Sequence, residues 1–188
     1  GLGDVYKRQG HMKGYHIKSR AWDWTLVKNP IWKKPAPEFY PVAFQWKKSK
    51  VGRVLDLGCG IGRNSILLSE LGFDVDAFDL SKEALDQLQK SSKDLHLTIR
   101  TTRGDMLSLP YVSSSFDYLV AFHVIYHTDR IGIEKVIFEI TRVLKPEGEF
   151  FITFNSKRSP QFTNKNYRVI DENTIVKNEG PEADMPHY

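Results

Sequence analysis

Residues 54–64 read VLDLGCGIGRN, and this stretch decides the fold. An apolar run that contains the acid Asp56 is followed by glycines at alternate positions, Gly58, Gly60 and Gly62. Glycine weakens both strands and helices, so its repetition indicates a turn that needs positive φ angles or a close approach of backbone to a ligand. Such a turn at the end of a buried strand and before a helix predicts a site for a nucleotide-like cofactor.

Strand and helix patterns alternate on both sides of this turn. Apolar runs and alternation predict strands over 53–58, 73–80, 95–102, 116–125 and 149–154. Helical spacing predicts helices over 62–72, after the cap Ser81, and over 130–144. Within 73–80, Phe73, Val75 and Ala77 are expected to face inward. Alternation of this kind predicts a doubly wound, Rossmann-like α/β fold with a mostly parallel sheet.

Composition limits the class of protein. The 188 residues suit one domain with a proper core, and no apolar run reaches the ~18–20 residues of a membrane span. The only cysteine, Cys59, excludes an internal disulfide and suggests a reducing, cytoplasmic compartment. The net charge of +4 comes without an arginine stripe, so nucleic acid is not the expected partner. We expect no metal site.

A dinucleotide cofactor fits the glycines poorly. The fingerprint G-x-G-x-x-G/A requires glycine or alanine at its third position. Counting from Gly58 that position is Arg63, and counting from Gly60 it is Ser65. An NAD-dependent oxidoreductase is therefore the weaker interpretation.

Four motifs in order resemble class I S-adenosylmethionine-dependent methyltransferases. VLDLGCGIGRN is similar to their D/E-x-G-x-G-x-G motif, and DAFDLS at 76–81 to their second motif. RGDMLSLPYVSSSFDYLV at 103–120 and EITRVLKPEGEFFITF at 139–154 resemble the later ones. The likeness covers about residues 50–155 and is strongest to the small bacterial ubiquinone/menaquinone-methylase-like group, of the methyltransferase domain 11 type.

The resemblance implies S-adenosylmethionine as cofactor and assigns its contacts. Gly58, Gly60 and Gly62 would line the methionine and ribose portion. Asp56 would orient the glycine loop and reach toward the amino group of the cofactor. Asp79 would accept both ribose hydroxyls, because a carboxylate with two oxygens matches a vicinal diol.

The remaining assignments concern the adenine and the methionine end. Leu80 would pack on the adenine face, Asp105 would accept from the adenine amino group, and the Met106 N–H would reach a ring nitrogen. Phe122 would lie near the methionine end. Plainer roles stay open: both Asp79 and Asp105 could be cap or loop acids, and Leu80 and Phe122 could be core.

The resemblance implies methyl transfer to a small-molecule acceptor. A sulfonium methyl is already activated, so the protein mainly aligns the acceptor and excludes water. A general base is needed only if the acceptor loses a proton, and His127 is the candidate catalytic residue, with His123 and Tyr126 weaker. The alternative is a non-catalytic or regulatory S-adenosylmethionine-binding protein of the same fold.

The flanks of the core carry further expectations. Residues 1–11 resemble a non-native leader, 12–50 an aromatic-rich helical cap before the 51–155 core, and 156–188 a polar tail with a short hairpin around Asp171–Asn173. The tryptophans of the cap either cover the cofactor or pack on the sheet. The resemblance implies a last helix and two final strands without a candidate here, so we expect a truncated chain that self-associates through the exposed edge of strand 149–154.

Overall fold

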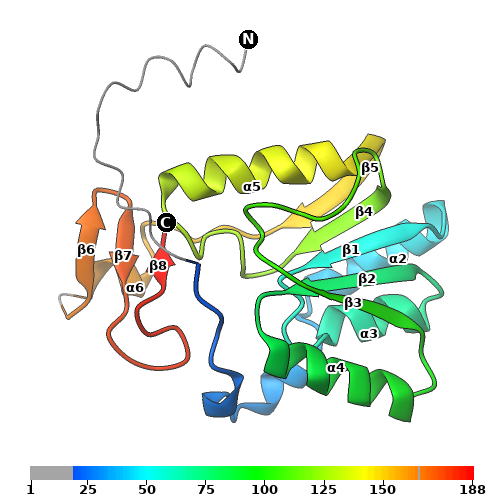
Figure 1. Cartoon of the computed structure of the whole chain (residues 1–188), viewed down its shortest axis with the longest axis horizontal. Helices are drawn as coiled ribbons and strands as arrows, with labels where there is room; N and C mark the ends of the chain where they lie inside the picture. Colours follow the sequence, from blue (N-terminus) through cyan, green and yellow to red (C-terminus); the bar gives the residue numbers. More distant parts are fainter. Residues whose placement is uncertain (1–18, 165) are drawn as a thin grey trace.

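The computed structural model describes residues 19–164 and 166–188. Its centre is a five-stranded parallel sheet with the strand order β3-β2-β1-β4-β5 (Figure 1). The strands are β1 (Arg53–Leu57), β2 (Asp74–Asp79), β3 (Ile99–Arg103), β4 (Phe116–Ala121) and β5 (Leu144–Ile152). The order reverses between β1 and β4, which is the topological switch point of an open α/β sheet. The doubly wound fold predicted from the sequence is confirmed.

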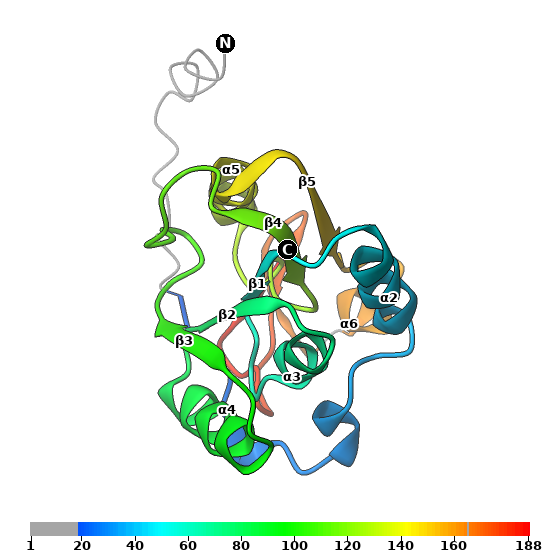
Figure 2. The same cartoon turned by 90° about the vertical axis from the view of Figure 1, so that its right-hand side faces the viewer.

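Helices cover both faces of this sheet (Figure 2). The helices are α2 (Phe39–Ser49), α3 (Arg63–Glu70), α4 (Lys82–Asp94) and α5 (Arg130–Val143). One apolar cluster joins α5 to β1, β2 and β4, and a second joins α2 and α3 to the opposite face. A third cluster packs Leu85 and Leu88 of α4 against Ala77. Each helix thus buries one apolar stripe, as the helical spacing predicted.

Side-chain caps fix where two of these helices begin. The Ser81 hydroxyl accepts from the Ala84 N–H at 3.2 Å, which confirms the predicted cap of α4. The Asp129 carboxylate accepts from the Gly132 N–H at 2.8 Å and caps α5. Each bond satisfies a backbone donor that the first helical turn leaves without an intrahelical partner.

The expected alternation in the second strand is wrong in one respect. Asp76 and Phe78 are buried as well as Val75 and Ala77, so β2 is covered on both faces. Asp76 accepts from Arg53 Nε at 2.9 Å and from an Arg100 nitrogen at 2.7 Å. Burial alone would raise the pKa of Asp76, but the hydrogen bonds from the two arginines hold it below the ordinary value. In the sequence, Asp76 has the polarity of an outward-facing residue. It can be buried because Arg53 and Arg100, which lie elsewhere in the sequence, pair with it.

Three strand boundaries differ from the prediction. β3 begins at Ile99 because α4 continues to Asp94 and His96 turns the chain with a φ of 55°. β4 ends at Ala121, just before His123 with a φ of 57°. β5 starts at Leu144 rather than at 149, and its register with β4 shifts between Phe116 and Tyr118.

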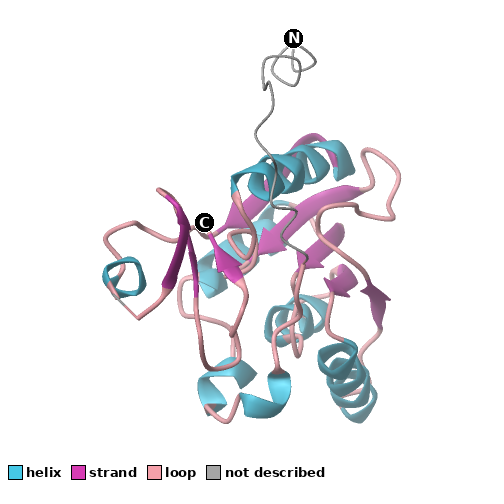
Figure 3. Cartoon of the chain, turned by 60° about the vertical axis from the view of Figure 1, so that its left-hand side comes forward, coloured by secondary structure: helices cyan, strands magenta, loops and turns pink. Residues whose placement is uncertain are grey.

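A second, antiparallel sheet follows the core (Figure 3). It contains β6 (Arg168–Asp171), β7 (Thr174–Val176) and β8 (Pro186–His187), after a short helix α6 (Pro160–Thr163). The predicted hairpin around Asp171–Asn173 is confirmed by the pairing of β6 with β7. β8 was not predicted, because a two-residue strand has no periodicity. Two 3₁₀ helices, η1 (Trp24–Leu26) and η2 (Pro30–Lys33), precede α2.

The outer edge of β5 agrees with the expectation for strand 149–154. Among the described residues β5 pairs only with β4, and the side chains of Phe150 and Phe154 are 60% and 59% exposed. Self-association at this edge stays a prediction. The leader expected at 1–11 lies outside the described residues. No described helix is both long and apolar enough to cross a membrane.

One buried hydrogen bond ties β1 to α3. Asp56 is 1% exposed, and one of its carboxylate oxygens accepts from the Ser65 hydroxyl at 2.6 Å. Burial raises the pKa of Asp56 to about 6, although the bond from Ser65 acts in the opposite direction. The strand and the helix on either side of the glycine loop are thus joined through a carboxyl group that ionises with difficulty.

This carboxyl should make stability depend on pH. An unfolded aspartate titrates near ~4, so the folded chain binds this proton more tightly, and the stability it contributes is lost as pH rises through about 6. The shift corresponds to about 3 kcal/mol. We expect the free energy of unfolding of the parent, minus that of Asp56→Asn, to fall by about this amount between about pH 4 and pH 7.5 in urea titrations.

Ser65→Ala is the matched control for this measurement. It removes the bond that lowers the pKa of Asp56, so its fall in stability over the same pH range should be larger than that of the parent. Parallel curves for the parent and Asp56→Asn would contradict the assignment.

Candidate functional site

A cavity of about 380 Å³ opens at the carboxyl ends of β1, β2 and β4. This is the edge at which an open α/β sheet binds ligands, next to the switch point. The glycine loop forms part of its wall together with residues that follow β2, β3 and β4. Segments from the two flanks of the core complete the lining, Ser19–Ala21 with three tryptophans on one side and Glu182 with Met185 on the other.

The glycine loop is fixed by backbone bonds. The Gly58 and Cys59 N–H groups both donate to the Phe78 carbonyl oxygen, at 2.8 and 3.0 Å. Gly60 has a φ of 54°, and a Cβ atom added there would lie 2.2 Å from the Trp24 ring. Glycine at this position therefore satisfies the positive φ and leaves room for the Trp24 ring, while its approach to a ligand stays a prediction.

Asp79 lies where β2 ends and faces this loop. Its Oδ2 accepts from the Gly60 N–H and its Oδ1 from the Ser81 N–H, both at 2.8 Å. Burial raises the pKa of Asp79 above its ordinary value, while these backbone bonds act in the opposite direction. Each carboxylate oxygen has two lone pairs, so both oxygens can accept a further hydrogen bond from a ligand in the cavity.

The residues after β2 and β3 form an adjoining wall. Leu80, Gly104, Asp105 and Met106 line the cavity. Asp105 Oδ1 accepts from the Leu107 N–H at 2.9 Å, which holds the turn that presents Asp105 and Met106. The wall thus combines apolar side chains with one acid, a composition suited to a flat ring that has polar edges.

Three tryptophans cover the opposite side. The Trp22 ring packs edge-on against those of Trp24 and Trp32, with centroids 5.0 and 4.8 Å apart. The Arg63 guanidinium lies 4.7 Å from the Trp32 ring centroid, within cation–π range. Trp46, by contrast, is buried in the core against Tyr118. The sequence left two positions open for the tryptophans, and both occur: three tryptophans line the cavity and one packs on the sheet.

Several buried polar atoms at the cavity lack a hydrogen-bond partner. They are Asn64 Oδ1 and the indole nitrogens of Trp22 and Trp24. A buried polar atom without a partner costs about 1–3 kcal/mol. Their presence around one cavity is therefore consistent with a ligand that supplies the missing bonds.

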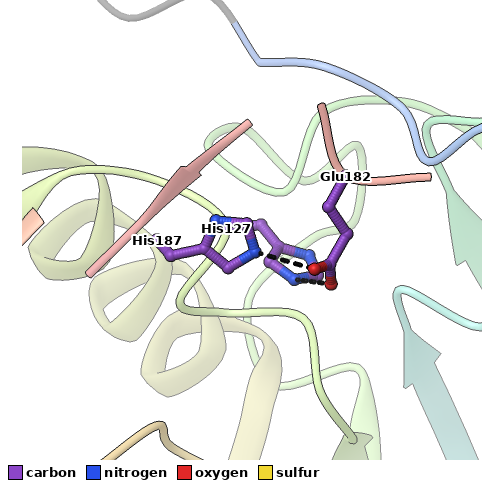
Figure 4. Close-up of side chains that lie close together, drawn as sticks. All are labelled: His127, Glu182 and His187. Atoms are coloured by element: carbon purple, nitrogen blue, oxygen red, sulfur yellow. Dashed lines mark ion pairs between the residues drawn. The ribbon is translucent and has the colours of Figure 1, made fainter. Parts of the chain in front are cut away.

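The far end of the cavity is built around His127 (Figure 4). His127 Nε2 lies 3.4 Å from Glu182 Oε1, an ion-pair distance whose geometry is too poor for a hydrogen bond. Burial lowers the pKa of His127, and the carboxylate of Glu182 only partly offsets this effect. Contacts with His127, His187 and Lys177 hold the pKa of Glu182 well below its usual range, against the effect of burial.

The structure brings most of the predicted site residues to this cavity. Those that line it are Gly58, Gly60, Asp79, Leu80, Asp105, Met106, Phe122 and His127. Asp56 and Gly62 do not line it: Asp56 faces Ser65 in the core, and a Cβ at Gly62 would meet Leu88. Their contacts with the cofactor stay predictions, and the described bond of Asp56 joins β1 to α3.

Sequence reasoning missed three contributors. Asn64 follows the glycine loop and lines the cavity, a position that could have been read from the start of the helix. Glu182 and Met185 come from the segment expected to be a polar tail. The Asp23 N–H donates to the Pro181 carbonyl oxygen at 3.1 Å, so this segment contacts the amino-terminal flank of the core.

Comparisons with known proteins agree with this architecture. The family model described as a methyltransferase domain matches residues 54–148. The probable S-adenosyl-L-methionine-dependent methyltransferase TehB of Haemophilus influenzae is 33% identical over 85 residues, 45% of this chain and 29% of that protein. The ubiquinone/menaquinone biosynthesis C-methyltransferase UbiE of Rickettsia bellii is 31% identical over 133 residues, 66% of this chain and 52% of that protein.

Among solved structures, the PH0226 protein of Pyrococcus horikoshii OT3 superposes with a TM-score of 0.66 and 26% identity, over 82% of this chain and 77% of that chain. The match covers 29% of the length of the first curated relative and 52% of the second, so the comparison concerns the domain they share. Because the family model covers half of the chain and contains the glycine loop, Asp79 and Asp105, the chain belongs to the class I S-adenosylmethionine-dependent methyltransferase family.

Proposed function

We propose that this chain binds S-adenosylmethionine in the cavity and transfers its methyl group to a small-molecule acceptor. The observation that carries the proposal is Asp79, whose carboxylate is fixed by the Gly60 and Ser81 N–H groups and keeps lone pairs for a diol beside the glycine loop. When bound, the cofactor supplies a methyl group already activated by its sulfonium.

The residues present fit this cofactor. Asp79 would accept the ribose hydroxyls, Leu80 would pack on the adenine face, and Asp105 with Met106 would contact the adenine edge. The backbone at Gly58 and Gly60 would approach the remaining portion, and the partnerless Asn64 Oδ1 could accept from its amino group. A cavity of about 380 Å³ lies within the range of pockets that enclose one small ligand.

The acceptor is assigned to the other end of the same cavity. We place His127 beside its reacting atom, with Phe122 near the methionine end of the cofactor. The tryptophan wall on one side and Glu182 on the other limit the room there, which favours a small molecule over a nucleic acid or a protein chain. Enclosure by these flanking segments would also exclude water from the reacting atoms.

Asp79→Asn should weaken binding of S-adenosylhomocysteine by about 1.5–3 kcal/mol, because a charge-assisted hydrogen bond to the ribose is lost. Isothermal titration calorimetry would show this as a roughly ten- to hundredfold larger Kd. The amide also leaves one backbone N–H without its acceptor, so the thermal midpoint without ligand should fall.

Asp129→Asn provides the matched comparison. Asp129 also accepts from a backbone N–H at the start of a helix but does not line the cavity. It should keep its affinity for S-adenosylhomocysteine, and its thermal midpoint should change little because the amide oxygen of asparagine can still accept the capping bond. Equal affinities for the parent and Asp79→Asn would remove Asp79 from the site.

Methyl transfer is tested by incubating the chain with methyl-labelled S-adenosylmethionine and a panel of small metabolites. We expect S-adenosylhomocysteine to form only when an acceptor is present. Binding without transfer to any member of a broad panel would favour the non-catalytic alternative. Binding of NAD in place of S-adenosylmethionine would contradict the proposal altogether.

A further inference from the structure

Three side chains from two distant segments of the chain meet at the end of the cavity (Figure 4). His127 comes from the loop after β4, Glu182 from the segment before β8, and His187 from β8 itself. One possible ligand atom from each lies within 4.8 Å of the others. The Glu182 carboxylate lies near both rings. Its Oε1 is 3.4 Å from His127 Nε2, and its Oε2 is 3.3 Å from His187 Nε2.

The two histidine–glutamate distances, each to a different carboxylate oxygen of Glu182, are close to the edge length of a tetrahedral metal site, and one ligand atom from each of the three residues lies within 4.8 Å of the others. Zinc binds histidine nitrogen at about 2.0–2.1 Å and carboxylate oxygen at about 2.0–2.2 Å, so two such ligands lie about 3.3–3.5 Å apart around a tetrahedral ion. Neither Nε2 atom forms a hydrogen bond, although both are buried. Two histidines and one glutamate are also a ligand set that zinc uses in catalytic sites.

The surroundings of His187 fix which nitrogen is free to bind. Its Nδ1 lies 2.9 Å from the Met185 carbonyl oxygen, and a carbonyl can only accept, so Nδ1 carries the hydrogen. The other ring nitrogen, Nε2, faces the Glu182 carboxylate at 3.3 Å. A histidine that ligates a metal typically donates its other nitrogen to a backbone carbonyl in this way.

We propose that His127, Glu182 and His187 bind a divalent transition-metal ion of the zinc type at the acceptor end of the cavity. Three protein ligands leave one position of a tetrahedral ion open. His127 and Glu182 line the cavity, so this position faces it. His127 then serves as a ligand, and this replaces the role of general base that the sequence suggested for it.

The site also narrows the class of acceptor, an extension that rests on the proposed function. A molecule that fills the fourth position must carry a donor atom that zinc binds, such as the oxygen of a hydroxyl group, the sulfur of a thiol or the nitrogen of an imidazole. Binding to the ion would fix this atom beside His127 and favour its deprotonated form. The metal site itself depends only on the three side chains.

Lys177 is the group that competes with the ion. Its ammonium contacts Glu182 Oε2, the oxygen that also faces His187. A cation at the cluster must share or displace this contact. Removing the ammonium should therefore strengthen metal binding. If the cluster is only an ion-pair network, the same change removes one of its partners and metal binding should not become tighter.

The test is titration of the metal-free chain, without cofactor, with Zn²⁺ by calorimetry and with Co²⁺ by its visible absorption. Glu182→Gln and His187→Asn should each weaken Zn²⁺ binding by more than about 100-fold, beyond the loss expected for an outer-sphere change. His96→Asn is the matched control, since His96 is exposed and outside the cluster, and it should bind like the parent. Lys177→Gln should bind Zn²⁺ more tightly.

Two further measurements distinguish a loss of metal binding from a loss of folding or of cofactor binding. Circular dichroism checks that each variant is folded, which matters most for the buried His187, and Glu182→Gln has almost the shape of the parent. Asp79→Asn should keep its Zn²⁺ affinity while losing S-adenosylhomocysteine affinity, so failure of the metal site and of the cofactor site are distinguishable. Equal Zn²⁺ affinity in the parent and Glu182→Gln, or weaker binding by Lys177→Gln, would overturn the proposal and leave a plain ion-pair cluster.

Discussion

The Phe78 carbonyl oxygen accepts two backbone hydrogen bonds, from Gly58 and from Cys59, and the site depends on this pair. They anchor the start of the glycine loop to β2, one residue before Asp79. Asp79 then accepts a hydrogen bond from the Gly60 N–H, so the end of β2 and the glycine loop are linked at two points. The glycine loop is therefore held by backbone N–H groups together with one carboxylate.

Much of this unit could be predicted from the sequence, because it is local. The glycine spacing requires positive φ angles whatever surrounds it, and Asp79 follows an apolar run that can only be a strand. The parallel direction of the strands also follows from the alternation of strands with helices. Asp76 shows where such reasoning ends: its burial depends on Arg53 and Arg100, and nothing local to Asp76 indicates that they will pair with it.

The acceptor end was harder to predict for the same reason. His127 and Glu182 are 55 residues apart, and β8 has only two residues, too few for any pattern. The segment 177–188 looks like a polar tail when its composition alone is considered. Its polarity instead supplies the groups that face the cavity, and the Tyr188 N–H donates to the Tyr126 carbonyl oxygen at 2.9 Å to hold it there. Long-range pairing of short elements carries no signal in a single sequence.

The distribution of the tryptophans gives the cavity its own optical signal. Trp22, Trp24 and Trp32 line it, with one ring directly against the glycine loop, while Trp46 is buried in the core beside Tyr118. Three of the four indoles are thus within reach of whatever occupies the cavity, and the fourth supplies a steady background. Intrinsic fluorescence consequently reports occupancy of this cavity directly, without any attached dye.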